Sequence, residues 1–309
     1  MKIRVVEVGP RDGLQNENPI RSLPVAELVD ARVRYVSQLA QSGLEDVEAG
    51  AFVRADRIPA MAGTDQVLKR LQTEFPELWK TKKFWTLVPN HKGLEMALAA
   101  GAKHISVFTA TSDAFNLKNI QMTVEDSLKG LKPVVEEAKR AGLAVRGYVS
   151  TVWGCPYSGF VPPERARFVT DQLLTMGVEE VSLGDTIGVA SPKQVEEVLR
   201  IFPKDMPLAA HFHDTRGTAI ANCLEAIQLG IKTVDSSAGG LGGCPYAKGA
   251  SGNLATEDLL YMLHGMGFTT GVDIEKVCEA SAYLEKELHL NLPSRFFKAW
   301  KGSTGRAQC

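Results

Sequence analysis

The stretch GVEEVSL, residues 177–183, comes directly after a helix-like segment. It begins with a glycine and continues as a short run rich in apolar and β-branched residues. This pattern of helix-like segment, glycine and β-rich run occurs at five places along the chain. The runs that follow the five glycines are 44–48, 102–108, 143–149, 178–183 and 231–235. Glycine accepts the left-handed conformation that ends a helix, so each passage predicts a joint between a helix and a strand.

Three further strand-like runs, 3–8, 84–88 and 207–213, bring the expected strands to eight. Most of them are separated by a helical pattern, which indicates right-handed βαβ crossovers and a parallel sheet covered by helices. Eight such units in 309 residues suit a closed (β/α)8 barrel better than an open doubly wound sheet. The first strand also lacks the glycine spacing of a dinucleotide-binding fold after it. The fold class we predict is therefore α/β, a (β/α)8 TIM barrel.

Helical periodicity is clear after residue 24, where apolar residues recur at Val25, Val29, Val33, Val36 and Ala40. We expect Ser22 to be the N-cap of this helix and Pro24 to lie in its first turn. Beyond the last strand, two helices at 255–265 and 273–288 and a short tail are expected. No linker divides the chain, so we predict a single catalytic domain over 1–309, with 255–309 as a C-terminal helical extension.

The bulk composition excludes several classes of function. The net charge is -1, so no basic field is present to attract nucleic acid or an anionic membrane surface. No run approaches the ~20 apolar residues of a membrane span, and the chain enters a strand without a signal segment. The five cysteines are scattered and odd in number, which favours reduced thiols. We therefore expect a cytoplasmic protein.

His211-Phe212-His213 stands at the end of an apolar run. Residues two apart on a strand project to the same face, so both imidazoles could reach one metal ion. The alternative is that the two histidines only form hydrogen bonds in a polar cavity. The pair alone leaves both interpretations open.

A (β/α)8 barrel carries its active site at the carboxyl ends of its strands. Polar side chains expected there are Arg11, Asp12, Glu48, Arg146, Tyr148, Ser182 and Asp185. Arg11 and Glu48 could instead form a structural ion pair, and Tyr148 could be a core aromatic. These alternatives also remain open from the sequence.

Glycine makes up six of the fourteen residues from 239 to 252, which is typical of a loop that moves or closely approaches a ligand. Cys244 is the single thiol in this loop. A glycine-rich loop that carries a cysteine is a candidate lid that delivers an acid or a nucleophile. Elsewhere, a free cysteine is usually a small, inert apolar residue.

The candidate metal ligands are two imidazoles, the Asp12 carboxylate and the Asn253 side-chain oxygen. This mixed nitrogen and oxygen set favours six-coordinate Mg²⁺ or Mn²⁺. Zinc is less favoured, because a structural zinc site would use thiolates.

The chain contains four motifs, VGPRDGLQNE at 8–17, SLGDTIG at 182–188, HFHDT at 211–215 and GLGGCPY at 240–246. Together they resemble the 3-hydroxy-3-methylglutaryl-CoA lyase family, and the resemblance extends over residues 3 to about 290. The first motif and the cysteine loop are long and specific. The HFHDT motif is shared more widely by barrel enzymes that make or break bonds next to a thioester or a 2-oxo acid.

The resemblance implies a (β/α)8 barrel, a divalent metal and cleavage of hydroxymethylglutaryl-CoA to acetyl-CoA and acetoacetate. It places the metal ligands at Asp12, His211, His213 and Asn253. It places catalytic residues at Arg11, Cys244, Asp185, His211 and Glu48, and substrate-binding residues at Arg11, Tyr148, Ser182 and Gln15. An acyl-CoA substrate and a homodimer or higher homo-oligomer are expected.

In this retro-Claisen reaction the C3 hydroxyl loses its proton as the bond between C2 and C3 breaks. Asp185 is the preferred proton acceptor, with His213 as the alternative. Arg11 would hold the thioester oxygen as it becomes an enolate. Cys244 would protonate the departing carbanion.

The chain departs from the family pattern at 51–57, which reads AFVRADR where relatives carry a serine and a different set of charges. This leaves the preferred acyl group open. Lys248 and Arg54 are the candidate coenzyme A contacts. Cys309, at the C-terminus, is a candidate for an adventitious or regulatory disulfide.

Two other functions compete. A Claisen-condensing acyltransferase of the isopropylmalate or homocitrate synthase type shares the barrel, but the chain is short for an added regulatory domain. A zinc hydrolase barrel commonly carries its H-x-H motif on the first strand, whereas the motif here lies on the seventh.

Overall fold

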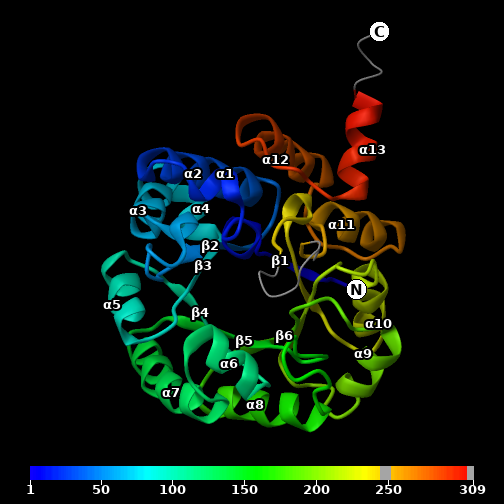
Figure 1. Ribbon diagram of the computed structural model, residues 1–309. Helices are drawn as coiled ribbons and strands as arrows, with labels where there is room; N and C mark the ends of the chain where they lie inside the picture. Colours follow the sequence, from blue (N-terminus) through cyan, green and yellow to red (C-terminus); the bar gives the residue numbers. More distant parts are fainter. Residues whose placement is uncertain (244–251, 305–309) are drawn as a thin grey trace.

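The computed structural model describes residues 1–243 and 252–304 and contains a closed barrel of parallel strands in the order β1 to β8 (Figure 1). The strands are β1 Arg4–Glu7, β2 Asp46–Ala51, β3 Lys83–Leu87, β4 His104–Ala110, β5 Ala144–Ser150, β6 Glu180–Asp185, β7 Leu208–Phe212 and β8 Thr233–Ser236. The predicted (β/α)8 barrel is therefore confirmed.

All eight expected strands form, with their ends shifted by up to three residues. The glycine joints are also confirmed. Gly43, Gly101, Gly142, Gly177 and Gly230 all have positive φ, between 76° and 109°. Several expected strands begin too early, because the first apolar residues after each glycine still belong to the connection and not to the sheet.

A ring of helices surrounds the barrel (Figure 1). The helices that connect successive strands are α1 Asn18–Arg21, α2 Val25–Gln41, α3 Thr64–Glu74, α4 Pro76–Thr81, α5 His91–Ala99, α6 Asp113–Ile120, α7 Val124–Arg140, α8 Pro163–Thr175, α9 Pro192–Leu199 and α10 Ala219–Gln228. Their buried apolar faces pack on the strands and form the main hydrophobic core.

The expected N-cap at Ser22 is wrong. Helix α2 begins at Val25 with Pro24 at the N-cap position, where no side chain caps the helix. Ser22 instead ends the short helix α1, and its Oγ donates to the carbonyl oxygens of Asn18 and Pro19 at 3.2 and 3.0 Å. The hydroxyl is used by the preceding helix and therefore does not cap α2.

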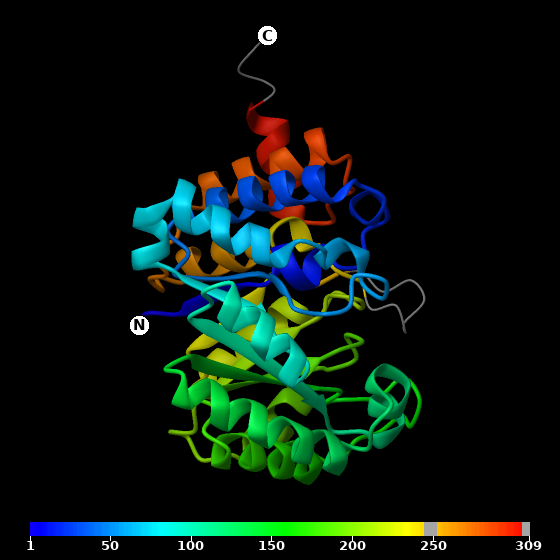
Figure 2. The same cartoon turned by 90° about the vertical axis from the view of Figure 1, so that its left-hand side faces the viewer.

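The C-terminal helices lie together beside the barrel (Figures 1 and 2). Helices α11 Thr256–Gly265 and α12 Ile274–Glu287 match the prediction, and α12 packs against α2. The expected short tail is wrong, because a further helix, α13 Arg295–Thr304, packs against α11 and α12. Phe297 is fully buried in this contact, with Phe296 and Trp300 packed against the core at helical spacing.

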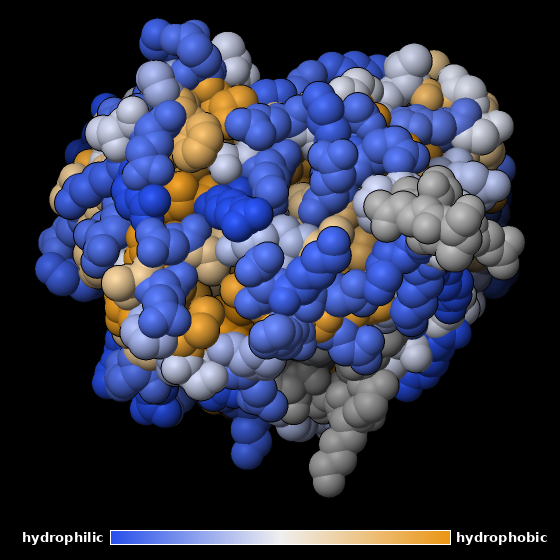
Figure 3. Space-filling model, turned by 90° about the horizontal axis from the view of Figure 1, so that it is seen from above, coloured by the Kyte–Doolittle hydropathy of each residue, from blue (hydrophilic) through white to orange (hydrophobic). Residues whose placement is uncertain are grey.

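The surface of the molecule seen from above the view of Figure 1 is mostly hydrophilic, and its hydrophobic residues form small, separate patches (Figure 3). This pattern is as expected for helices whose outer faces contact water. Among the helices of the described residues, we find none with the length and apolar character needed to cross a membrane.

Charged side chains fill part of the barrel interior below its carboxyl end. Arg146 donates from Nε to Glu180 at 2.8 Å and from Nη2 to Asp235 at 2.6 Å. Arg4 pairs with Glu180 and, at 3.2 Å, with Asp46. Buried charges need partners, and this chain of alternating signs supplies them. It forms the floor of the site described next.

Candidate active site

Strand β1 leads directly into one turn of π-helix, η1 Gly9–Gly13, at the mouth of the barrel. The turn is closed by backbone hydrogen bonds that span five residues, from Gly13 N to Val8 O at 3.2 Å and from Leu14 N to Gly9 O at 2.9 Å. A Cβ on Gly9 would lie 2.6 Å from Glu7 Oε1 and from Tyr35 Oη, so only glycine fits at this position. The turn presents Arg11 and Asp12 above the barrel.

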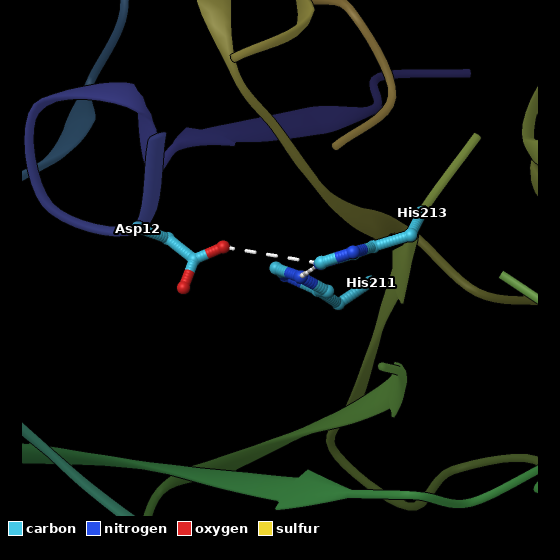
Figure 4. Close-up of side chains that lie close together, drawn as sticks. All are labelled: Asp12, His211 and His213. Atoms are coloured by element: carbon cyan, nitrogen blue, oxygen red, sulfur yellow. Dashed lines mark hydrogen bonds and ion pairs between the residues drawn. The ribbon is translucent and has the colours of Figure 1, made fainter. Parts of the chain in front are cut away.

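His211 and His213 lie at the end of β7, opposite this turn (Figure 4). Their Nε2 atoms are 3.2 Å apart, and His213 Nε2 lies 3.9 Å from Asp12 Oδ2. One ligand atom from each of the three residues lies within 4.8 Å of the others. Asp12, His211 and His213 therefore form a possible metal site.

Asn253 joins this group from beyond the glycine-rich loop. Its Nδ2 donates to Asp12 Oδ2 at 2.9 Å and to Leu241 O at 3.0 Å. Its Oδ1 is buried and has no hydrogen-bond partner among the described residues. Asn253 also pairs with His213 in an isolated β-bridge, and a buried side-chain oxygen without a partner is a ligand type that divalent cations accept together with carboxylate and imidazole.

The charges at this site perturb the pKa values of its members. Burial opposes ionisation of Asp12, but the charges of Arg11, His211 and His213 outweigh it and lower the pKa of Asp12 to about 2. Burial lowers the pKa of His213 to about 4. An ionised carboxylate and a neutral imidazole at neutral pH are the protonation states that bind a metal.

Arg11 is buried between two carboxylates. It donates from Nε to Glu48 Oε2 at 2.8 Å and from Nη1 to Asp12 Oδ1 at 2.7 Å. The ion pair between Arg11 and Glu48 that the sequence left open is thus present. Arg11 also lines the cavity of the site, so the pair does not remove the guanidinium from it.

The Tyr148 ring lies between two guanidinium groups, with its centroid 5.3 Å from Arg11 Cζ and 5.0 Å from Arg146 Cζ. Its hydroxyl accepts from Arg146 Nη1 at 2.8 Å, and its ring meets that of His211 edge-on at 6.2 Å. Tyr148 is therefore buried as part of the main hydrophobic core and also forms a wall of the site.

A cavity of about 360 Å³ opens beside the possible metal site formed by Asp12, His211 and His213. Its polar lining includes Arg11, Asp12, Gln15, Tyr148, His211 and His213. Gln15 also donates to Asp12 Oδ1 at 2.9 Å. A second, larger cavity of about 1030 Å³ lies beside the first, and the two share the lining residues Val53, Arg57, Ile58, Phe108 and Asn119.

Ser182 and Asp185 lie on β6 but are not among the residues that line this cavity. Ser182 Oγ points into the barrel and donates to Asp235 Oδ2 at 2.7 Å. The Asp185 carboxylate accepts from the backbone N–H groups of Val189 and Ala190, each at 3.0 Å. Residues 182 and 185 differ by an odd number and so face opposite sides of the strand. This position gives no support to Asp185 as the proton acceptor.

The other predicted residues either lie outside the described part of the chain or lie away from the possible metal site. Cys244, Lys248 and Cys309 lie outside the described residues. Arg54 is exposed, pairs with Asp56 at 2.6 Å and lines the second cavity. The three cysteines in the described part of the chain, Cys155, Cys223 and Cys278, are free and buried.

Sequence reasoning missed Asp235, although it was the last residue of an expected strand. Asp235 Oδ2 lies 3.2 Å from His211 Nδ1, and the two residues are register partners on β7 and β8. The available signal was an acidic residue within an apolar strand that is buried on both faces. Such a residue needs a buried polar partner.

A closed parallel barrel that gathers an aspartate, two histidines and an arginine at the carboxyl ends of its strands has the architecture of a (β/α)8 enzyme with a possible metal site. Comparison with known proteins places the chain more narrowly. The family model HMGL-like matches residues 2–284. The chain belongs to the HMGL-like family.

The mitochondrial hydroxymethylglutaryl-CoA lyase of Bos taurus is 45% identical over 301 residues, which cover 96% of this chain and 89% of the relative. The crystal structure of the Bacillus subtilis HMG-CoA lyase has a TM-score of 0.90 and 44% identity, covering 97% of this chain and 98% of that one. An HMG-CoA lyase from Acinetobacter baumannii in complex with coenzyme A and 3-methylmalate has a TM-score of 0.86 and 33% identity, covering 96% and 95%.

Proposed function

We propose that this protein is a metal-dependent carbon-carbon lyase that cleaves 3-hydroxy-3-methylglutaryl-CoA to acetyl-CoA and acetoacetate. The observation that carries the proposal is the joint placement of Arg11 and the group Asp12, His211 and His213 on one cavity. The lyases named above, at 33 to 45% identity over nearly the whole chain, support it.

Asp12, His211, His213 and Asn253 are the residues that would hold the ion, and their oxygen and nitrogen donors favour Mg²⁺ or Mn²⁺ over Zn²⁺. When bound, a divalent cation supplies Lewis-acid chemistry, which acidifies a hydroxyl group beside it. Asn253 donates to Asp12 and Gln15 donates to the other oxygen of the same carboxylate. These two amides would keep the Asp12 carboxylate oriented toward the cavity.

Arg11 is placed to bind the thioester oxygen. Glu48 and Asp12 take up some of its N–H groups and hold the guanidinium against the Tyr148 ring. The remaining N–H groups can donate to an oxygen on which negative charge develops. Fixed donors of this kind stabilise an enolate without reorganising during the reaction. Glu48 therefore acts on the reaction through Arg11.

We assign the protonation of the departing carbanion to Cys244, following the resemblance of the loop motif. Gly242 and Asn253 flank the loop on the side of the metal group, where a Cβ on Gly242 would lie 2.5 Å from Asn253 Nδ2. The described ends of this loop are thus anchored beside Asp12 and Asn253.

The second cavity suits the long arm of an acyl-CoA. It adjoins the cavity at Asp12, His211 and His213, and its lining is mainly apolar. Its charged residues are Arg54, Arg57, Lys92, Asp56 and Asp65. An apolar channel would cover the pantetheine arm, and the cations could pair with phosphate groups. Lys248, the other candidate contact, lies outside the described residues.

The condensing acyltransferase alternative is not favoured, because the close relatives across the chain are lyases. The cytoplasmic location and the homo-oligomer remain predictions. The free, buried thiols of Cys155, Cys223 and Cys278 are consistent with a reducing compartment.

The test is an assay of the purified protein with Mg²⁺ and either hydroxymethylglutaryl-CoA or a longer-branched analogue. We expect acetyl-CoA and acetoacetate from the first substrate. If only the analogue is cleaved, to acetyl-CoA and the matching 3-oxo acid, the preferred substrate carries a longer acyl group than the one proposed. Condensation of acetyl-CoA with a 2-oxo acid, without cleavage, would overturn the proposal in favour of the acyltransferase.

A further inference from the structure

We propose that Asp235 is a positioning residue that fixes the proton of His211 on Nδ1 and so leaves Nε2 free to face the metal position. This inference adds a residue role to the proposed function, and it depends on the proposed function only in assuming that a metal ion binds at the site. The proton position itself is a property of the protein alone.

The first observation is the register of the barrel. His211 and Asp235 are paired residues on adjacent parallel strands, and both side chains point into the barrel. His211 Nδ1 lies 3.2 Å from Asp235 Oδ2, while His211 Nε2 lies on the other side of the ring, 3.2 Å from His213 Nε2. The two ring nitrogens of His211 therefore face two different environments.

The second observation is the set of donors around Asp235. Arg146 Nη2 donates to Oδ1 at 2.6 Å, and Ser182 Oγ donates to Oδ2 at 2.7 Å. The side chain is completely buried beside the equally buried Arg146. Arg146 Nη1 also lies 3.3 Å from Oδ2, so the buried guanidinium contacts both oxygens, which is the arrangement of an ionised carboxylate paired with a fixed positive charge.

An ionised carboxylate can only accept hydrogen bonds. The proton between Asp235 and His211 must therefore reside on His211 Nδ1. A neutral imidazole carries one proton, so Nε2 keeps its lone pair and can act as a ligand. A carboxylate behind a histidine ligand fixes both the tautomer and the ring orientation in this way.

The decisive variant is Asp235→Asn, which keeps the size of the side chain. Its oxygen is needed by the buried Arg146 guanidinium, so its NH₂ group faces His211 Nδ1. His211 must then accept at Nδ1 and carry its proton on Nε2, where a metal would bind. We expect the affinity for Mn²⁺, measured by calorimetry, to fall about 10- to 100-fold.

The matched control is Glu180→Gln. Glu180 is the other carboxylate that pairs with Arg146, at 2.8 Å from Nε, and no contact between it and His211 is recorded among the described residues. The control removes one charge from the same ionic chain, and we expect Mn²⁺ affinity to stay within about twofold of the wild type. An equal loss in both variants would overturn the proposal, because the effect would then arise from Arg146 and not from the tautomer of His211.

A readout without metal or substrate separates this inference from the proposed function. Long-range ¹H–¹⁵N NMR of the metal-free protein distinguishes the two histidine tautomers, and His211→Gln identifies the signal. We expect the Nδ1-protonated form in the wild type and the Nε2-protonated form in Asp235→Asn. The Nε2-protonated form in the wild type would overturn the inference, even if Asp235→Asn failed to fold. Loss of lyase activity alone would bear on the proposed function only.

Discussion

Arg11 and Glu48 meet through a single carboxylate oxygen: Nε donates to Glu48 Oε2 at 2.8 Å, and Nη2 lies 2.7 Å from the same atom. The other oxygen of Glu48 accepts from Ser106 Oγ at 2.8 Å. Arg11 Nη1 donates to Asp12. These contacts use three of the five N–H groups of the guanidinium, so two can face a substrate.

The first prediction concerns Arg11→Gln. We expect kcat to fall by about 10²- to 10³-fold, because a donor to the developing enolate is lost. Arg11→Lys should also be slow, since an ammonium group cannot reproduce the fork that binds Glu48 and substrate together. Steady-state kinetics checks kcat, and Mn²⁺ titration checks that the metal site survives. Near-normal turnover in Arg11→Gln would remove Arg11 from the mechanism.

The second prediction concerns metal removal. EDTA should abolish activity, and added Mg²⁺ or Mn²⁺ should restore it. Mn²⁺ should also raise Tm, because a ligand at 100 times its Kd stabilises the folded state by about 2.7 kcal/mol. In Asp12→Ala the shift of Tm should disappear, since that site loses its carboxylate. A Tm that responds equally in wild type and variant would place the ion elsewhere.

The third prediction concerns Cys244→Ser. We expect a folded enzyme with much lower kcat, since a hydroxyl is a far weaker acid than a thiol. Cys223→Ser is the comparison among the buried thiols, because Cys223 lies in the helix α10 and not in the loop. Circular dichroism checks the fold and an acetyl-CoA assay checks turnover. Full activity of Cys244→Ser would show that the loop thiol is not the acid.

The fourth prediction concerns pH and the buried Glu7. Burial raises its pKa to about 8, although Thr256 Oγ1 and the N–H groups of Gly9 and Ala238 donate to it. The folded protein thus binds a proton that the unfolded chain has already lost between about pH 4.5 and pH 8. Stability should therefore fall as pH rises through this window.

Glu7→Gln tests the sign. The amide can keep its oxygen on the two backbone N–H groups and donate to Thr256, so the variant should fold. Its stability, measured by urea unfolding between pH 5 and pH 9, should depend less steeply on pH than that of the wild type. An unchanged slope would exclude Glu7 as the source of the effect.

The fifth prediction concerns two glycines. Gly43 has a φ of 103°, and a Cβ there would lie 2.1 Å from Gly271 O, so Gly43→Ala should destabilise the protein by about 1–3 kcal/mol or more. Gly130 lies in helix α7 with nothing within 4 Å of an added Cβ. Gly130→Ala should stabilise the protein by about 0.5–1 kcal/mol. Thermal unfolding of both variants provides the comparison, and equal effects would contradict it.

Local sequence patterns predicted most of the helices and strands. Each of the eight strands was visible as an apolar run, and the five glycine joints have the positive φ expected of them. The errors lie where a second element competes for the same residue. Ser22 ends α1 and does not cap α2, and α13 forms because its aromatic residues pack on the other C-terminal helices.

The candidate site shows the same difference between local pattern and tertiary contact. The sequence predicts Asp12, His211, His213 and Asn253 as site residues, because motif residues at strand ends converge on one rim of a barrel. The sequence does not predict which side chain each of these residues contacts. That Asp185 accepts from two loop N–H groups depends on which face of β6 it occupies.

The sequence by itself determined the alternation of helices and strands, the barrel and the residues that gather at its mouth, because these follow from local periodicity and from glycine conformation. Only the tertiary structure decided that Asp235 stands behind His211 and that Glu48 holds Arg11. Side chains alternate between faces with a period of two, so a strand boundary uncertain by one residue leaves the facing partner undetermined. Closure of the barrel fixes the register and with it these contacts.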